Sequence, residues 1–100
     1  MSANNYVLFL TSEAEVEIVD AVVWYEEQQI GLGERFEIEI RKSFNRILEN
    51  PLTNAKIHGD KRRVKIIHFP YGIYYQLIEN DVIVLAVVSY LRNPNLWKSK

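Results

Sequence analysis

Cysteine is absent from the 100-residue sequence, and proline, glycine and histidine are scarce, with three, four and two residues each. Without thiols the chain forms no disulfide, binds no zinc through thiolates and has no cysteine nucleophile. The two histidines, His58 and His68, are too few for an ordinary metal centre. We therefore expect no metal site and no bound cofactor.

Long apolar runs are missing as well. No stretch of about 18 apolar residues is present to cross a bilayer, and the longest apolar runs, such as Val82–Val88, have the length of a strand. The N-terminus carries no basic segment, and the apolar run Tyr6–Leu10 is too short for the core of a signal peptide. We expect a cytoplasmic protein that makes no membrane contact.

What is present suits one globular domain. Hydrophobic residues make up 48% of the chain and charged residues 25%, close to the averages for globular proteins. A chain of this length buries roughly two-thirds of its unfolded surface around one core. We expect a single domain over residues 1–100.

The net charge of −1 conceals two halves of opposite sign. Residues 1–55 hold ten acids against four bases, a charge of −6, whereas residues 56–100 hold eight bases against three acids, a charge of +5. One face of the protein could therefore meet an anionic partner. The alternative is that each half is simply solvated in its own way.

Two helices are predicted in the first half. The first begins at Thr11-Ser12, an N-cap followed by acids, and ends near Gln29. Its apolar residues recur at spacings of three and four, which predicts one buried face and an acidic outer face. Gly31-Leu-Gly33 reverses the chain, and a second helix with Phe36 in its apolar stripe ends at Asn50-Pro51. So short a loop predicts an antiparallel hairpin.

Strands make up the rest of the predicted fold. Tyr6–Leu10 precedes the first helix, and three β-rich runs follow the second at Arg63–His68, Ile73–Ile78 and Val82–Ser89. Residues Leu52–Asp60 show no periodicity and are interpreted as a loop. The last run does not alternate, so it is expected to be a central strand. The pattern predicts an α+β fold of order β-α-α-β-β-β, with the helical hairpin packed on one face of a mainly antiparallel four-stranded sheet.

The clearest candidate site is the basic run that begins the second strand. Strand alternation points Arg63 and Lys65 the same way, where they can hold neighbouring phosphates or the carboxylates of an acidic partner. Charged edge strands also deter aggregation, which is the alternative role for these residues. Arg92 follows the last strand, where an arginine reaches a ligand from a rigid frame, and its alternative role is a surface ion pair.

Aromatic residues cluster in or beside the sheet. Tyr74 and Tyr75 point to opposite sides of their strand, so one can face the helices while the other remains available to a partner. The residues expected to bind a partner are Lys61, Arg62, Arg63, Lys65, Tyr75, Arg92 and Trp97.

Several short segments, in this order and spacing, carry a family resemblance. They are Trp24-Tyr-Glu26, Gly31-Leu-Gly-Glu-Arg-Phe36, Asn50-Pro51, Arg62-Arg63, Phe69-Pro-Tyr-Gly-Ile-Tyr-Tyr75 and Ala86–Pro94. With them the chain closely resembles the RelE/ParE superfamily of toxins from bacterial type II toxin–antitoxin systems. The resemblance implies a growth-inhibiting, plasmid-stabilising toxin, neutralised by a cognate antitoxin whose tail wraps over it. It also implies a homodimer or a heterotetramer with the antitoxin.

Two activities occur on this fold, and the resemblance implies one of them. RelE-like toxins cleave messenger RNA on the ribosome, and Arg63, Lys65 and Arg92 match three of their catalytic positions. Gly72 stands where the strand-three arginine belongs, and Trp97 stands near the position of a C-terminal tyrosine, so as a nuclease the chain would be an endoribonuclease with an incomplete catalytic set.

ParE-like toxins instead poison DNA gyrase without any hydrolysis of their own. The Trp-Tyr, Gly-Leu-Gly and Phe-Pro-Tyr segments favour this ParE-like interpretation. A third interpretation is an inactive module that keeps only its antitoxin contact. Whether the chain is an enzyme therefore depends on which activity it has.

Overall fold

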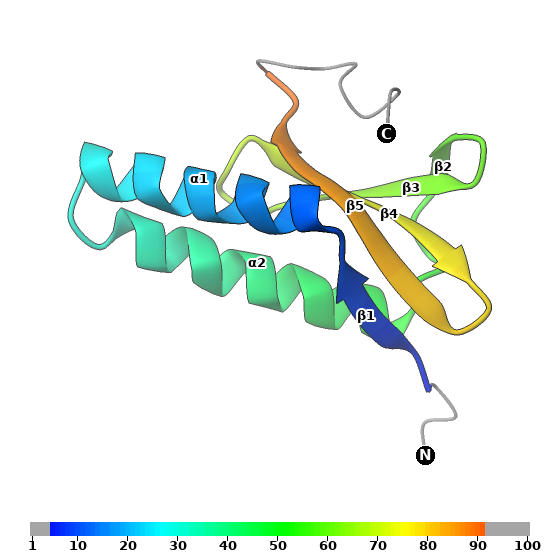
Figure 1. Ribbon diagram of the computed structural model, residues 1–100. Coiled ribbons are helices and arrows are strands. Elements are labelled where there is room, and N and C mark those ends of the chain that lie inside the picture. The colour runs from blue at the N-terminus through cyan, green and yellow to red at the C-terminus, as the bar shows by residue number, and fades with distance from the viewer. Residues whose placement is uncertain (1–4, 92–100) are drawn as a thin grey trace.

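The computed structural model describes residues 5–91, which form two layers (Figure 1). A helical hairpin covers one face of a sheet, which confirms the predicted α+β class (Figure 1). The elements are β1 (Val7–Leu10), α1 (Ser12–Gln28), α2 (Leu32–Glu49), β2 (Lys56–His58), β3 (Lys61–Lys65), β4 (Tyr71–Ile78) and β5 (Asp81–Ser89). None of the helices in this part of the chain is long and apolar enough to cross a membrane.

The sheet has five strands in the order β1-β5-β4-β3-β2. As predicted, β5 is central, pairing in parallel with β1 and antiparallel with β4. The predicted count of four strands is wrong because Lys56–His58 lies within the segment interpreted as a loop and pairs antiparallel with β3. A strand of three residues is too short to show an alternating pattern in the sequence.

The start of α1 is joined to the central strand through polar side chains. Thr11 is the N-cap, and its hydroxyl accepts a hydrogen bond from the amide of Ala14 at 3.1 Å and donates one to the carbonyl of Leu85 at 3.3 Å. Leu85 lies where the register between β4 and β5 shifts by one residue. Glu17 accepts from the amide of Val87 at 2.9 Å. The bulge in β5 is therefore held by α1, which fixes the helix against the sheet.

The turn between the helices depends on one carboxylate and two glycines. Glu26 accepts hydrogen bonds from the amides of Gly31 at 2.9 Å and Gly33 at 3.0 Å. Gly31 has a φ of 91°, which a side chain would strain. A Cβ atom at Gly33 would lie 2.6 Å from the carbonyl oxygen of Val22, so this glycine lets the two helices approach closely.

The main core lies between the two layers, and a smaller one lies on the far face of the sheet. Phe36 of α2 and Ile73 of β4 are fully buried in the main core. On the opposite face, Tyr74 packs with Ala86 and Val88, and Ile57 of β2 lies against this cluster. The added strand thus covers part of a sheet face that has no helices.

Candidate functional site

The basic run on β3 presents three cations on the sheet face away from the helices. Val64 is only 8% exposed and belongs to the core beneath the helices, so its neighbours in the strand point the other way. These neighbours include the predicted pair Arg63 and Lys65, and Lys61 follows the same alternation. Their partners in β4 are Tyr74, Gly72 and Gln76 respectively. We call Lys61, Arg63 and Lys65 the basic row.

The basic row is supported by aromatic residues. The ammonium group of Lys65 lies 5.2 Å from the centre of the Tyr90 ring, a cation–π contact. Arg63 runs beside Gly72, where its Cδ would be 3.2 Å from an added Cβ atom. Within residues 5–91, no carboxylate forms an ion pair with Arg63 or Lys65. Their charges are therefore available to an anionic group of another molecule.

Unlike Arg63 and Lys65, Arg62 interacts with the backbone of its own chain. It points toward the helix layer, where its guanidinium donates hydrogen bonds to the carbonyls of Leu52 and Asn54. These bonds hold the chain that leaves α2 against the sheet. Although Arg62 was expected to bind a partner, the structure uses its guanidinium to hold this segment.

Tyr75 is not available to a partner, contrary to prediction. Its side chain is fully buried, and its hydroxyl donates to the carbonyl of Pro51 at 2.6 Å and accepts from the Asn54 amide at 3.1 Å. Burial raises the pKa of the phenol, while the hydrogen bond from Asn54 and the charge of Arg62 lower it in part. The expectation failed because both faces of β4 are covered: Tyr75 faces the helices, and Tyr74 lies in the smaller core.

Two further residues expected to bind a partner, Arg92 and Trp97, lie outside the described residues, as does Lys98. His58 and His68 are both exposed, and His68 adopts a φ of 73° in the turn between β3 and β4. No group of three or more histidine or acidic residues that could hold a metal ion occurs within residues 5–91.

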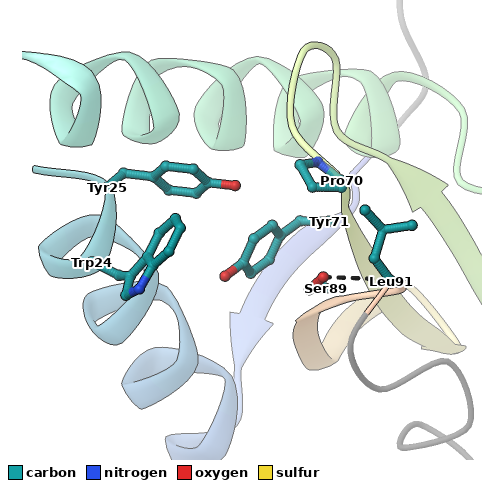
Figure 2. Close-up of a pocket in the computed structure, with 6 residues that line it drawn as sticks. All are labelled: Trp24, Tyr25, Pro70, Tyr71, Ser89 and Leu91. Atoms are coloured by element: carbon teal, nitrogen blue, oxygen red, sulfur yellow. Dashed lines mark hydrogen bonds between the residues drawn. The ribbon is translucent and has the colours of Figure 1, made fainter. Parts of the chain in front are cut away.

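A small apolar pocket lies where the end of α1 meets the start of β4 and the end of β5 (Figure 2). Its volume is about 180 Å³, and it is lined by Trp24, Tyr25, Pro70, Tyr71, Ser89 and Leu91. The Ser89 hydroxyl accepts from the Leu91 amide at 3.3 Å, which shapes its rim (Figure 2). Cavities of this size hold one aromatic ring, so the pocket can receive one large apolar side chain of a partner.

Three of the segments that carried the family resemblance meet beside this pocket. The Tyr25 ring lies 5.2 Å from that of Phe36 and 4.9 Å from that of Phe69, measured between centres. Phe36 also contacts Tyr71, at 5.0 Å. Because these aromatic residues join both helices to the sheet, their shared task is to fix the hairpin on the sheet. The aromatic residues of these motifs therefore stabilise the fold.

Comparison with known families identifies the group to which the chain belongs. Residues 8–94 match the family model described as the ParE toxin of the type II toxin–antitoxin system parDE. The chain is a member of the ParE toxin family. A search of curated proteins found no match.

Solved structures share the fold of this ParE-family chain. A chain of the chromosomal ParDE system from P. aeruginosa superposes with a TM-score of 0.70 at 13% identity, covering 87% of this chain and 98% of that one. A chain of the intact E. coli RelBE toxin–antitoxin complex gives 0.61 at 25% identity, covering 82% and 93%. The isolated E. coli RelE toxin gives 0.61 at 22% identity, covering 95% and 99%.

The pocket is the part of the candidate site that the sequence did not reveal. Trp24-Tyr25 and Pro70-Tyr71 were both noted as motifs, yet they are far apart in the chain. Only the packing of α1 against the start of β4 brings them together (Figure 2). Their shared aromatic character was the one available indication that they meet.

Proposed function

We propose that this ParE-family chain is the toxin of a type II toxin–antitoxin module, that it arrests bacterial growth by interfering with DNA gyrase, and that a cognate antitoxin neutralises it. The observation that carries the proposal is the basic row together with Gly72 of the neighbouring strand. The basic row offers cations for binding, whereas glycine stands at the position where RelE-like toxins have a catalytic arginine. Family membership over residues 8–94 supports the same assignment.

Gly72 argues for binding over cleavage. Phosphoryl transfer depends on preorganised cations around the developing charge, and the loss of one such donor costs on the order of 10²–10³ in rate. The space beside Gly72 is also occupied, because an added Cβ atom would lie 3.1 Å from the Tyr74 ring and 3.2 Å from Arg63. A long cationic side chain at this position would have to displace both neighbours.

One observation keeps messenger RNA cleavage as the second candidate. Arg63 and Lys65 lie two residues apart on one face of β3, the arrangement that suits successive phosphates of a single strand. The RelBE complex chain at 25% identity also supports this candidate. In that case Arg63, Lys65 and Arg92 would be the catalytic residues, with the ribosome and mRNA as the target.

For the antitoxin, we propose contact with the basic row and with the pocket lined by Trp24 and Tyr71. Arg63 and Lys65 lack carboxylate partners within residues 5–91, which favours an acidic partner segment. The pocket would receive an apolar side chain from the same segment. Such a contact would hide the cations from any target, in a heterotetramer or a smaller complex.

The test compares two double variants with the same change in charge. Arg63→Ala/Lys65→Ala removes two cations from the basic row, and Arg41→Ala/Lys42→Ala removes two exposed cations from α2. Each chain is induced in a bacterial host without antitoxin. Growth and the 5′ ends of transcripts are followed within minutes, and the purified protein is added to gyrase in a supercoiling assay.

We expect growth arrest with intact transcripts and inhibition of supercoiling by the unmodified chain and by the α2 variant. The basic-row variant should inhibit supercoiling at least about tenfold less, since each lost charge-assisted contact is worth about 1.5–3 kcal/mol. New transcript ends inside codons would overturn the gyrase assignment in favour of the nuclease. Normal growth with the unmodified chain would mean an inactive antitoxin-binding module.

A further inference from the structure

The outer surface of α1 carries an apolar stripe that belongs to neither hydrophobic cluster of residues 5–91. Val16, Val19 and Val23 have exposed fractions of 58%, 59% and 50%. Their spacings of three and four place them in one line along the helix, because successive residues are rotated by about 100°. Ile30, 92% exposed, extends the apolar surface past the end of the helix. We call these four residues the outer stripe.

Carboxylates flank the outer stripe on both sides. By the same rotation, Asp20 and Glu27 lie along one edge and Glu15 lies along the other. The helix contains six acidic residues and no lysine or arginine. The surface is therefore apolar in the middle, with acidic residues at both edges.

We propose that the outer stripe is the docking surface for an amphipathic helix of a partner protein, one with apolar residues on its contact face and lysine or arginine along both flanks. The apolar residues would cover the valines, and the cations would meet the carboxylates at the two edges. Charge complementarity carries this choice of partner, because no cation of α1 itself offsets the acids.

The same charges argue against other occupants. Two copies of this chain joined through α1 would bring acids against acids. The anionic surface of a phospholipid membrane would be repelled for the same reason. By strand alternation about Val64, the basic row lies on the opposite side of the sheet from the helices, so the two surfaces can be occupied at once.

The experiment uses the full chain and a fluorescent peptide as long as α1, with leucines spaced by three and four and lysines along both flanks. A peptide of the same composition in shuffled order, which lacks an apolar face, is the first control. A peptide with glutamate in place of lysine is the second. Affinity is measured by fluorescence anisotropy at two salt concentrations.

A matched pair of variants locates the binding site. Val19→Lys and Ile38→Lys each replace an exposed branched residue with a cation, one on α1 and the other on α2, where Ile38 is 39% exposed. Val19→Lys should weaken binding of the lysine peptide at least about tenfold, because it removes an apolar contact at the centre of the interface and adds repulsion. Ile38→Lys should leave the affinity unchanged, and both variants should keep the melting temperature of the parent.

Several outcomes would overturn the proposal. Equal affinities for Val19→Lys and Ile38→Lys, or for the lysine peptide and either control peptide, would remove α1 as the site. A dimer that dissociates in Val19→Lys, seen by sedimentation, would assign the outer stripe to a second copy. Much tighter peptide binding by a chain truncated after Leu91 would show that the C-terminal residues of this protein occupy the surface. Binding of the unmodified chain to anionic vesicles would likewise contradict a protein partner.

Discussion

The two helices have similar lengths, 17 residues in α1 and 18 in α2, yet they present different surfaces. In α2 four acids are balanced by four bases, and Ile38 is its one large hydrophobic residue with notable exposure. In α1 six acids stand without a base, and three valines are exposed. Thus α2 has one apolar face, which packs within the fold, whereas α1 has two, of which only one packs within the fold.

The helices also begin differently. The N-cap of α1 is the side chain of Thr11, which is linked to β5 as well. The N-cap of α2 is Gly31, which has no side chain to offer, and Glu26 of α1 binds the nearby amides in its place. The start of α2 therefore depends on α1. Substitutions in each helix can test this difference between them.

The largest effect is expected in the buried face of α2. Phe36→Ala should lower the free energy of unfolding by about 3–5 kcal/mol, because it removes a fully buried ring that packs on Tyr25, Phe69 and Tyr71. Urea denaturation of the variant and the parent measures the loss. A change below 1 kcal/mol would mean that the aromatic cluster does not hold the hairpin to the sheet.

A smaller loss is expected where the helices approach each other. Gly33→Ala places a Cβ atom 2.6 Å from the backbone of α1 and should cost about 1–3 kcal/mol, since the helices must separate. Gly31→Ala is the control, because nothing lies within 4 Å of its Cβ position and only the φ of 91° opposes the change. A smaller loss at Gly33 than at Gly31 would show that helix separation does not limit stability.

Next in size is the dependence of α2 on a carboxylate of α1. Glu26→Ala leaves the amides of Gly31 and Gly33 without their acceptor and should cost about 1 kcal/mol. Glu27→Ala, at the adjacent exposed position, removes the same charge and should change stability by less than about 0.5 kcal/mol. Equal losses of stability in the two variants would mean that Glu26 acts through its charge and not through its hydrogen bonds to the two amides.

The smallest effect is expected in the outer stripe. Val23→Ser should change the free energy of unfolding by less than about 0.5 kcal/mol, because the side chain is half exposed. Thermal and urea denaturation provide the measurement. A loss above 1 kcal/mol would mean that this side of α1 packs within the fold after all, and the contrast between the helices would fail.

Much of the helical layer could be predicted because its determinants are local. The N-cap at Thr11, the reversal at Gly31–Gly33 and the stop at Asn50 all depend on neighbours in the sequence, and the structure places them as expected. The central position of β5 followed from its unbroken apolar run. The exposed valines of α1 could not be foreseen, since periodicity shows which residues share a face but not whether a second apolar face is covered.

The candidate site was less predictable because it depends on contacts between distant segments. The common direction of Arg63 and Lys65 follows from strand alternation alone. The burial of Tyr75 instead requires Pro51 and Asn54, which lie more than 20 positions earlier, and the covering of Tyr74 requires β2. No local pattern reports such contacts, and the pocket beside Trp24 was missed for the same reason.

The position of β5 between β1 and β4 has a consequence for the order in which the protein folds during its synthesis. Within residues 5–91, β1 has one neighbour in the sheet, β5, with which it pairs from Val7↔Asp81 to Leu10↔Val84. Contacts so distant in sequence form late, after the loop between them has closed. While the ribosome is still making the chain, β1 and the helices therefore lack the strand that joins them to the basic row. A chain built in this way completes its sheet only once the segment containing β5 has left the ribosome.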